Sequence, residues 1–386
     1  MRVGIVVNEF NIRGGTHKQV QRLAEHLQAC GDNALVLTKY FDPDRCYPGV
    51  ERLAVTCGTG RREPPAWKFG AGVVEFLASV KLAWIAARRC DVVTFHDNHV
   101  KLVWLLVRLF NPGLGATWQI NDLPQAFRVG PSSGRRPGPT TRVRDAVRRW
   151  ATRRMGRGVD LVTVNVGKNA QRVLEHLGVE AVVHHCGVDL RNPELPGGRR
   201  PPQGVLRLVS TGVFFEYRNY EAILRAQQAL RERHGIESRL TLIGSTRLSP
   251  AYAKRVVELA ATLRVPCEIL GEVDDERLVR AYGESDVFLF LNVDQSWGLA
   301  VFEAMNFGLP VIVSSSVGAR ELLHPGVDAE VLDPAATAEI ADALQRLFAD
   351  PALYRARSAA AFQATQGMTW AALYCEPVTA ELRSLT

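Results

Sequence analysis

The sequence predicts an α/β protein made of two Rossmann-like, doubly wound domains. Short runs of β-branched residues alternate with helical stretches, a pattern typical of parallel sheets covered by helices on both faces. The pattern begins at the N-terminus and starts again after residue 204, and 386 residues are enough for two domains of ordinary size. Between the two halves, residues 189–204 are rich in Pro, Gly and charge, which predicts an interdomain linker.

The first half combines five predicted strands with amphipathic and apolar helices. The stretch 17–30 has one apolar face and is followed by Gly31, which predicts a helix that ends there. Two apolar stretches, VVEFLASVKLAWIAA and LVWLLVRLF, carry charges inside them and are predicted to be core helices rather than membrane spans. The predicted strands are 3–7, 34–38, 91–97, 116–122 and 161–165.

The second half predicts another open α/β unit. Ligands of such sheets bind beyond the carboxyl ends of the strands. We therefore expect the two domains to face each other across a cleft, with polar residues that follow the strands as candidate site residues. The predicted strands are 206–212, 239–245, 267–273, 286–292 and 310–315, and the predicted helices are 219–233, 251–264, 275–284 and 299–307.

Composition narrows the class of protein. A hydrophobic content of 47% and a charged content of 23% are ordinary for a globular chain. The N-terminal MRVGIVVNEF is too short in its apolar run for a signal peptide and predicts a buried strand. Seven cysteines without a CxxC pair argue against a disulfide framework and a zinc site. These features favour a cytoplasmic protein.

The positive charge is unevenly distributed. The chain has a net charge of +7, and the stretch from Arg135 to Arg157 holds nine arginines and one acid. One interpretation is a solvated loop and helix. The other is peripheral contact with an anionic membrane or another anionic partner. Nucleic acid is not an expected partner, because no recognised nucleic-acid motif accompanies the charge.

The segment DQSWGLAVFEAMNFGLPVIVSS, residues 294–315, is the most informative part of the sequence. A polar loop leads into a short helix that stops at Gly308, and the backbone amides at the start of such a helix suit a diphosphate. Glu303 lies about one turn inside, where its carboxylate can accept hydrogen bonds from two ribose hydroxyls. The alternative is that Glu303 only favours the helix N-terminus.

Extended to SWGLAVFEAMNFGLPVIVSSSVGARELL, this segment resembles the donor-binding signature of the retaining GT4-type glycosyltransferases, which have the GT-B fold. Further stretches resemble the same family in the same order: IRGGTHKQVQRLAEHL, CGVD, GEVDDERLVRAYGESDVFLF and GMTWAALYCEPVTAELRSL. The resemblance implies an acceptor-side domain (1–190), a donor-binding domain (204–365) and a C-terminal helix (366–386) that packs back on the first domain.

The resemblance also assigns roles on the donor side, for a nucleotide diphospho-sugar of UDP or GDP type and no other cofactor. Glu303 would bind the ribose, the amides of Gly298 and Leu299 would lie near the diphosphate, and Gln295 would contact the sugar hydroxyls. Residues 271–273 would flank the base. The expected donor-binding set is Arg218, Gly244, Gly271, Val273, Gln295, Ser296, Trp297, Gly298, Leu299 and Glu303.

Two donor-side positions depart from the family pattern. Gln295 stands in place of a Glu and lacks its charge, and Val213 stands in place of an Arg and cannot bind a phosphate. Arg218 stands where the family has a Lys, and its guanidinium can bind a phosphate with two N–H groups. Arg247 or Lys18 could supply the missing second cation.

The acceptor side is assigned to the loop after the first strand and to a later strand end. Paired glycines at 14 and 15 let backbone approach a ligand closely, and an ordinary strand–helix turn is the alternative. The absence of GxGxxG disfavours dinucleotide binding. The expected acceptor-side set is Gly14, Gly15, Thr16, His17, Lys18, His96 and Asp97.

ATWQINDLP resembles the family's strand that ends in His-Asp, with Asn121 in place of the His. Asn cannot exchange protons at neutral pH, but it can orient a hydroxyl. Positioning and electrostatics suffice if the leaving phosphate takes the acceptor proton. No metal is expected, because FHDNH lacks a clear third ligand. The expected catalytic set is Asn121, Asp122, Gln295 and Glu303.

These features predict a retaining, metal-independent hexosyltransferase that acts on a small-molecule or lipid acceptor. One alternative is a relative that binds a nucleotide-sugar or a partner without transfer, as the residues at 121, 213 and 295 suggest. Another is a sugar-nucleotide epimerase, whose expected catalytic acids are not recognisable in the sequence. LVWLLVRLF and the Arg-rich stretch permit a lipid acceptor at a membrane surface, but a small metabolite is equally compatible.

Overall fold

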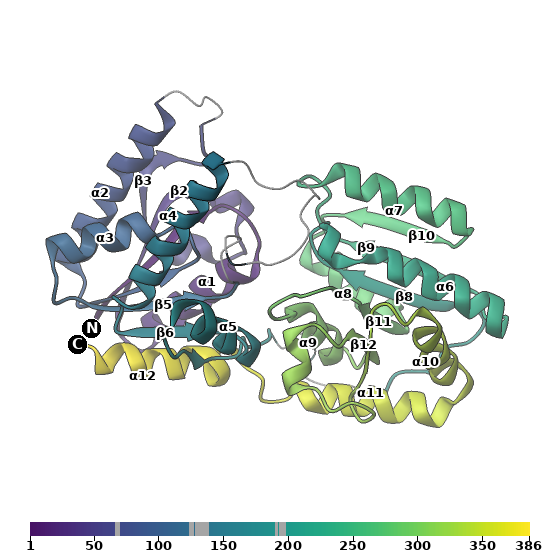
Figure 1. Cartoon of the computed structure of the whole chain (residues 1–386). Helices are drawn as coiled ribbons and strands as arrows, with labels where there is room; N and C mark the ends of the chain where they lie inside the picture. Colours follow the sequence, from purple (N-terminus) through teal and green to yellow (C-terminus); the bar gives the residue numbers. More distant parts are fainter. Residues whose placement is uncertain (66–69, 123–126, 128–138, 190–191, 193–197) are drawn as a thin grey trace. The chain divides into compact units, whose positions relative to one another are not determined.

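The computed structural model describes residues 1–65, 70–122, 127, 139–189, 192 and 198–386 (Figure 1). The chain forms two compact α/β units, each with its own parallel sheet. Unit 1 comprises Met1–Gly187 and Trp370–Thr386, and unit 2 comprises Val188–Thr369. The predicted fold class, two Rossmann-like doubly wound domains, is confirmed.

Unit 1 is built on a seven-stranded sheet with the order β3-β2-β1-β4-β5-β6-β7. The chain leaves β1 first toward β2 and later toward β4, so β1 is the switch point beside which ligands of such sheets bind. The strands are β1 (Arg2–Phe10), β2 (Asn33–Phe41), β3 (Ala54–Arg61), β4 (Val92–His96), β5 (Gly115–Ile120), β6 (Leu161–Val164) and β7 (Val182–Val183).

Helices cover both faces of this sheet. Apolar side chains of α2, α3, α4 and α5 pack with the strands into one core on one face. The crossover through α1 runs in the opposite direction along the sheet, and its right-handed connection places α1 on the other face. The helices are α1 (Gly15–Ala29), α2 (Ala71–Arg89), α3 (Lys101–Phe110), α4 (Pro139–Gly156) and α5 (Gly167–Leu177).

The C-terminal segment of the chain completes unit 1. It contains a five-residue π-helix (Ala371–Cys375) followed by α12 (Glu376–Ser384). Arg383 of α12 pairs with Asp32 at 3.0 Å, and His184 contacts the Glu381 carboxylate at 2.8 Å. These contacts fix α12 on unit 1.

Unit 2 has a six-stranded sheet with the order β10-β9-β8-β11-β12-β13. Its helices bury their apolar faces in a core that includes Leu208, Ile223 and Tyr354. The strands are β8 (Leu206–Thr211), β9 (Ser238–Ile243), β10 (Cys267–Gly271), β11 (Val287–Phe290), β12 (Val311–Ser314) and β13 (Ala329–Leu332), and the helices are α6 (Tyr220–His234), α7 (Pro250–Leu263), α8 (Asp275–Glu284), α9 (Leu299–Asn306), α10 (Thr337–Ala349) and α11 (Pro351–Thr365).

Three strands were not predicted from the sequence: β3, β7 and β13. Each of them lies at an edge of its sheet. An edge strand is only partly covered, so it lacks the continuous apolar run that marks a central parallel strand. The segment AVTCGTGR of β3 illustrates this, because two glycines and two threonines interrupt its apolar residues.

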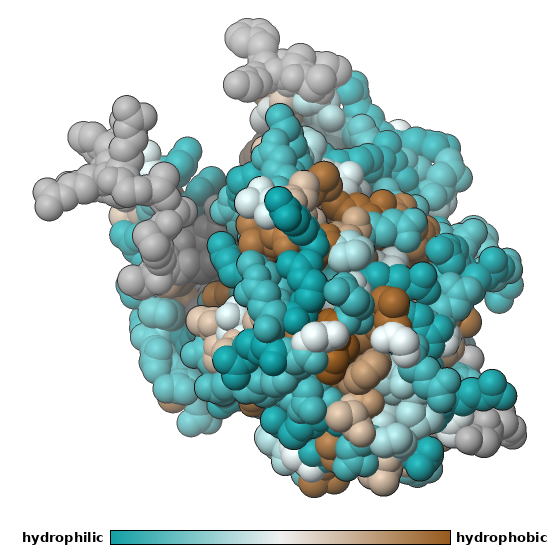
Figure 2. Space-filling view, turned by 90° about the vertical axis from the view of Figure 1, so that its right-hand side faces the viewer, coloured by the Kyte–Doolittle hydropathy of each residue, from teal (hydrophilic) through white to brown (hydrophobic). Residues whose placement is uncertain are grey.

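Among the described residues, no helix is long and apolar enough to cross a membrane. On the face shown in Figure 2, hydrophilic side chains predominate and apolar ones lie among them. The stretches predicted as core helices, α2 and α3, do bury one face each. Their outer faces, however, expose large apolar side chains such as Phe76 and Leu109.

Candidate functional site

Glycines lie against one another at the carboxyl ends of three neighbouring strands of unit 2: Gly212 follows β8, Gly244 follows β9, and Gly271 is the last residue of β10. The Gly244 amide donates to the Gly271 carbonyl at 2.8 Å, and the Gly212 amide donates to the Ile243 carbonyl at 2.8 Å. Gly244 has a φ of +148°, and a Cβ there would lie 2.0 Å from the Gly212 carbonyl oxygen. Only glycine therefore allows this close approach of the strand ends.

Arg218 lies directly over this glycine platform. A Cβ on Gly212 would be 2.2 Å from the Arg218 guanidinium carbon, so the missing side chain makes room for the cation. Nε of Arg218 donates to the Val213 carbonyl at 3.1 Å, and Nη1 donates to Oε1 of Gln295 at 3.2 Å. Arg218 as a whole is 9% exposed, and its guanidinium also lies over the Phe290 ring, 5.8 Å from the ring centre. These contacts fix a cation at the carboxyl edge of the sheet.

Gln295 connects this cation to the loop before α9. Its side-chain amide contacts the side-chain amide of Asn292. Its backbone carbonyl accepts a hydrogen bond from the Gly318 backbone amide at 3.1 Å. Gly298, with a φ of +136°, directly precedes α9, and a Cβ there would lie 3.0 Å from Phe290. The N-terminus of α9 and Arg218 thus contact the same aromatic ring, which places the helix amides and the cation on one site.

Glu303 of α9 is held by a tyrosine. The Tyr282 hydroxyl donates to Oε2 of Glu303 at 3.5 Å and lies 3.3 Å from Oγ1 of Thr211, the last residue of β8. The carboxylate is partly exposed, whereas the tyrosine is buried against Phe288 and Phe307. Glu303 therefore sits near the end of β8, on the same edge as Arg218. No motif in the sequence singles out Tyr282, which lies inside α8.

The other expected donor-side residues are either buried in unit 2 or lie at the ends of its strands and helices. Trp297, one of the expected donor-binding residues, is 3% exposed, and its indole stacks on Phe302 at 5.2 Å inside unit 2. Ser296 is also buried, Leu299 is the first residue of α9, and Val273 follows β10. Arg247 pairs with the exposed Glu272 at 3.2 Å, beyond the end of β10. Val213 contributes its carbonyl to Arg218.

In unit 1, the loop after β1 leads into α1 as predicted. Gly14 precedes the helix, and a Cβ there would lie 3.1 Å from Nδ1 of His17. The His17 ring stacks on Phe10 and its Nε2 lies 2.9 Å from the Glu9 carbonyl, so Nε2 carries the proton. Burial lowers the pKa of His17 to about 4. Lys18 is buried with its ammonium over the Tyr47 ring at 4.3 Å, and it belongs to unit 1, not to the donor unit.

Asn121, just beyond β5, lies at the centre of a network of amides. Its Nδ2 donates to Oγ1 of Thr16 at 2.9 Å and to Oε1 of Gln19 at 2.5 Å, and its Oδ1 accepts from Gln119 at 3.1 Å. Its carbonyl accepts from Asn169 at 2.6 Å. The network ties the start of α1 to the end of β5, and all of its side chains are uncharged.

Asp122 is exposed to solvent and His96 is fully buried, so neither position resembles a partly enclosed catalytic site. The Asp122 side chain is exposed, and its carbonyl accepts from Nδ2 of Asn98 at 2.9 Å. His96 is fully buried inside β4, and burial lowers its pKa to about 3. The expectation that His96 lines the acceptor site is therefore wrong in this structure, because β4 turns its imidazole into the core.

Asp97 directly follows β4, has a φ of +70° and accepts hydrogen bonds from two backbone amides. Its carboxylate accepts from the Asn8 amide at 2.8 Å and from the His99 amide at 2.6 Å. Burial raises the pKa of this carboxyl group. Among the described residues, no cluster of three or more His, Cys, Asp or Glu side chains could hold a metal ion.

A further set of charged groups surrounds Asp97, and the sequence analysis missed it. Lys39, near the end of β2, is 7% exposed, and its ammonium makes no hydrogen bond or ion pair with any described residue. Burial lowers the pKa of Lys39, and the charges of Glu75, Asp97 and Glu9 act against that shift. Burial also raises the pKa of Glu9. A scan of polar residues at every strand end, including NEF and TKYF, would have found this cluster.

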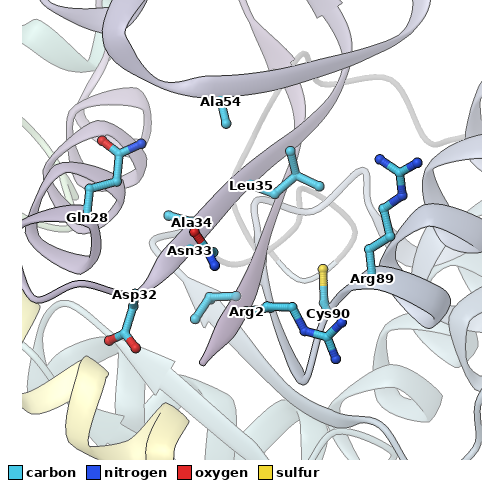
Figure 3. Close-up of a pocket in the computed structure, with 10 residues that line it drawn as sticks. Arg2, Gln28, Asp32, Asn33, Ala34, Leu35, Ala54, Arg89 and Cys90 are labelled. Atoms are coloured by element: carbon cyan, nitrogen blue, oxygen red, sulfur yellow. The ribbon is translucent and has the colours of Figure 1, made fainter.

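Two cavities lie at the opposite edges of the sheets. One, of about 430 Å³, is lined by Arg2, Asp32, Asn33 and Cys90 near the amino ends of β1 and β2 (Figure 3). The other, of about 640 Å³, lies by the amino ends of β8 and β9 and is lined by Arg200, Arg207 and Arg239, among others. Ligands of open α/β sheets bind beyond the carboxyl ends. We therefore do not assign either cavity to the candidate site.

Family models and relatives agree with this arrangement. A model described as "Glycosyl transferase 4-like domain" matches residues 14–187, and one described as "Glycosyl transferases group 1" matches 194–364. The phosphatidyl-myo-inositol mannosyltransferase of Mycobacterium leprae is 25% identical over 382 residues, which are 96% of this chain and 93% of the relative. The glycogen synthase of Mycobacterium tuberculosis is 26% identical over 391 residues, with coverage of 94% and 90%.

Solved structures share the fold over the full length. Sucrose-phosphate synthase from Thermosynechococcus elongatus has a TM-score of 0.80 at 18% identity, with all of both chains covered. Anabaena HepE, solved in complex with UDP-glucose, has a TM-score of 0.77 at 15% identity with the same coverage. The two family models match unit 1 and unit 2 in turn. The protein therefore belongs to the GT4-like glycosyltransferases, with the GT-B fold.

Proposed function

We propose that the protein transfers a hexosyl group from a UDP- or GDP-type sugar, with retention of anomeric configuration and without a metal ion. The donor is assigned to unit 2 and the acceptor, a small molecule or a lipid, to unit 1. The observation that carries the proposal is the convergence of Arg218, the α9 N-terminus and Glu303 at one sheet edge. These groups match the phosphates and the ribose of a nucleotide diphospho-sugar.

The cation and the helix end suit the diphosphate. Arg218 uses Nε and Nη1 for the protein, whereas Nη2 donates no hydrogen bond to a described residue. We assign Nη2 to a phosphate oxygen. The amides at the start of α9 would supply further donors, since the first amides of a helix have no partner within it. Because Val213 replaces a second cation, these amides would stabilise a larger share of the negative charge on the diphosphate.

The carboxylate suits the ribose. A carboxylate accepts hydrogen bonds from two neighbouring hydroxyls, and such charge-assisted bonds contribute about 1.5–3 kcal/mol each. The Tyr282 hydroxyl donates to the Glu303 carboxylate at 3.5 Å and so favours one orientation of it before the nucleotide binds. Gln295, bound to Arg218, is the residue we assign to the sugar hydroxyls. Its neutral amide can both donate and accept, which suits hydroxyl groups.

The charged cluster of unit 1 suits a hydroxyl-rich acceptor. A buried ammonium without a protein partner is costly unless water or a ligand solvates it. A hydroxyl group can accept from Lys39 while it donates to Glu9 or Asp97, and so can join a cation to a carboxylate. Among the relatives, names such as phosphatidyl-myo-inositol mannosyltransferase and D-inositol 3-phosphate glycosyltransferase refer to polyol acceptors. They support this class of acceptor.

In the proposed reaction, the glycosidic bond forms as the bond to the leaving phosphate breaks. The acceptor proton goes to the departing phosphate oxygen, and retention follows if attack occurs on the face that the phosphate leaves. Asn121 is held as a neutral hydrogen-bonding group by Gln19, Gln119 and Thr16. We therefore assign it to orientation of substrate, not to proton transfer.

Calorimetry with UDP, GDP and their sugars tests the donor half. We expect one nucleotide class to bind and Glu303→Gln to weaken it at least about tenfold, the equivalent of 1.4 kcal/mol. Glu339→Gln, which removes an exposed carboxylate of α10, is the matched control. Binding that survives Glu303→Gln unchanged, or no binding to any nucleotide, contradicts the proposal. NMR of the product's anomeric proton then tests retention.

The second candidate is a relative that binds a nucleotide-sugar without transferring it. The observation in its favour is the network around Asn121, in which every side chain is uncharged and none can take up a proton at neutral pH. Release of free nucleotide from a bound sugar donor, in the presence of polyol acceptors, distinguishes the two. Sustained release supports the transferase, and binding without release supports the second candidate.

A further inference from the structure

One face of unit 1 exposes an unusual amount of apolar surface. Of the nineteen large apolar side chains exposed in the described residues, ten lie on α2, α3 and α4. Scattered apolar side chains are normal on a protein surface, but a concentration of them marks a contact surface. We call the outward sides of these three helices the outer face. It includes Phe76, Leu77 and Trp84 of α2, Leu109 of α3, and Val147 and Trp150 of α4.

The three helices are neighbours in one layer. They cover the same face of the sheet and share one core with it, and Figure 1 shows α2, α3 and α4 close to one another over this sheet. The exposed side chains lie on the sides turned away from that core. The outer face is also distinct from the candidate acceptor residues, which lie at the ends of strands.

The orientation of α4 is the clearest evidence. Its apolar positions Val143, Val147 and Trp150 follow helical spacing and form one stripe, and they are 65%, 57% and 66% exposed. An amphipathic surface helix ordinarily turns such a stripe inward. Here Thr152 and Met155 are buried instead. The stripe is therefore exposed although a sheet lies beneath the helix, which marks it as a candidate contact surface.

The charge around the stripe indicates the kind of surface that would match it. Arg144, Arg148, Arg153 and Arg154 of α4 are exposed. Asp145 pairs with Arg148 at 3.9 Å, whereas Arg144 and Arg154 pair with no acid among the described residues. A helix that combines an apolar stripe containing Trp with many arginines is typical of the interface of an anionic bilayer. Arginine stems add apolar surface while their guanidinium groups reach the phosphates.

We propose that the outer face of α2, α3 and α4 docks unit 1 on an anionic phospholipid surface. A protein partner would have to match apolar side chains spread over three helices and also several unpaired cations. A bilayer satisfies both requirements without a defined shape. The proposal does not depend on which sugar is transferred, because it concerns where the protein resides.

Co-sedimentation of the full chain with vesicles tests the proposal. We expect binding to vesicles of phosphatidylcholine with phosphatidylglycerol, and much weaker binding to phosphatidylcholine alone. High salt should reduce binding, because it screens the arginines. Val147→Ser combined with Trp150→Ser should lower the partition coefficient about tenfold, since both lose buried apolar area. Thermal unfolding should stay unchanged, because both side chains are exposed.

Matched controls distinguish binding through the outer face from nonspecific adsorption to vesicles. Leu248→Ser with Val257→Ser removes two equally exposed apolar side chains from unit 2 and should leave vesicle binding unchanged. Arg144→Gln with Arg154→Gln should weaken binding to the anionic vesicles, whereas Arg225→Gln with Arg355→Gln, also exposed, should not.

Three results would overturn the proposal. The first is absence of binding to anionic vesicles, and the second is equal binding by the α4 variant and its control. The third is a dimer in sedimentation velocity that the Val147→Ser, Trp150→Ser variant abolishes, which would assign the outer face to a second copy of the chain. None of these results affects nucleotide binding by unit 2, so the proposed transfer is judged separately.

Discussion

Replacing Gly244 with alanine tests how the strand ends of unit 2 are built. The residue has a φ of +148°, and the added Cβ would lie 2.0 Å from the carbonyl oxygen and 2.5 Å from the carbonyl carbon of Gly212. Both are backbone atoms of β8's end, which is paired with β9 along its whole length. The clash therefore cannot be relieved by a change of rotamer.

The expected loss of stability has two parts. A non-glycine residue at such a φ costs about 1–3 kcal/mol, and overpacking against a rigid neighbour costs about 1–3 kcal/mol more. Together they predict a loss near 4 kcal/mol. For a unit of this size, about 2–4 °C of melting temperature is lost per kcal/mol, so the transition of unit 2 should fall by about 10 °C. Because Arg218 lies over Gly212, nucleotide affinity should fall as well.

The matched control is Gly235→Ala. Gly235 also has a positive φ, +67°, but an added Cβ there meets nothing within 4 Å. It should cost only the backbone strain, about 1–2 kcal/mol. Calorimetric unfolding of both variants, with hydrogen exchange of the β8–β10 amides to identify the transition of unit 2, gives the comparison. Equal losses in the two variants would refute the reasoning, since they would mean that the close approach to Gly212 is not real.

Three further predictions concern single side chains. Tyr282→Phe removes the hydroxyl that positions Glu303, so nucleotide affinity should fall about fivefold, the equivalent of roughly 1 kcal/mol, with thermal unfolding little changed; calorimetry that finds no change contradicts this role. Asn121→Ala leaves the Gln19 oxygen without its donor and should lower the free energy of unfolding by about 1–3 kcal/mol, which chemical denaturation measures; an unchanged midpoint would show that the network contributes nothing. Burial lowers the pKa of His96 from 6.5 to about 3, so the fold favours the neutral ring, and its contribution to stability is present above pH 6.5 and lost as the pH falls toward 3. His96→Asn should therefore lose less stability than the wild type between pH 7 and pH 5, and equal losses would contradict the assignment.

The sequence was sufficient to predict the central parts of both sheets. The predicted strands 3–7, 34–38, 286–292 and 310–315 all fall on strands of the structure, because central parallel strands are buried on both faces and read as continuous apolar runs. Helix α8 was predicted with its observed limits, 275–284. Asp274 caps this helix by accepting from the Arg277 amide, and such caps are local signals.

The candidate site was only partly predictable. The donor segment from Gln295 to Glu303 was found because its loop, glycine and helix are contiguous in the sequence. Tyr282 and Lys39 were missed because their significance depends on residues distant in the chain. The Tyr282 hydroxyl contacts Thr211 and Glu303, and the Lys39 ammonium interacts electrostatically with Glu9 and Asp97. His96 was misjudged, since a motif does not show which way a side chain faces.

By itself, the sequence determined the fold class, the family and the segment that begins α9, because each depends on local periodicity or on a contiguous motif. Tertiary structure alone decided which charges lie beside one another and which apolar stripes face water. The reversed α4 illustrates the reason. Its stripe of Val143, Val147 and Trp150 has the spacing of a helix that packs inward, and only the position of the sheet, beneath Thr152 and Met155, shows that it is exposed.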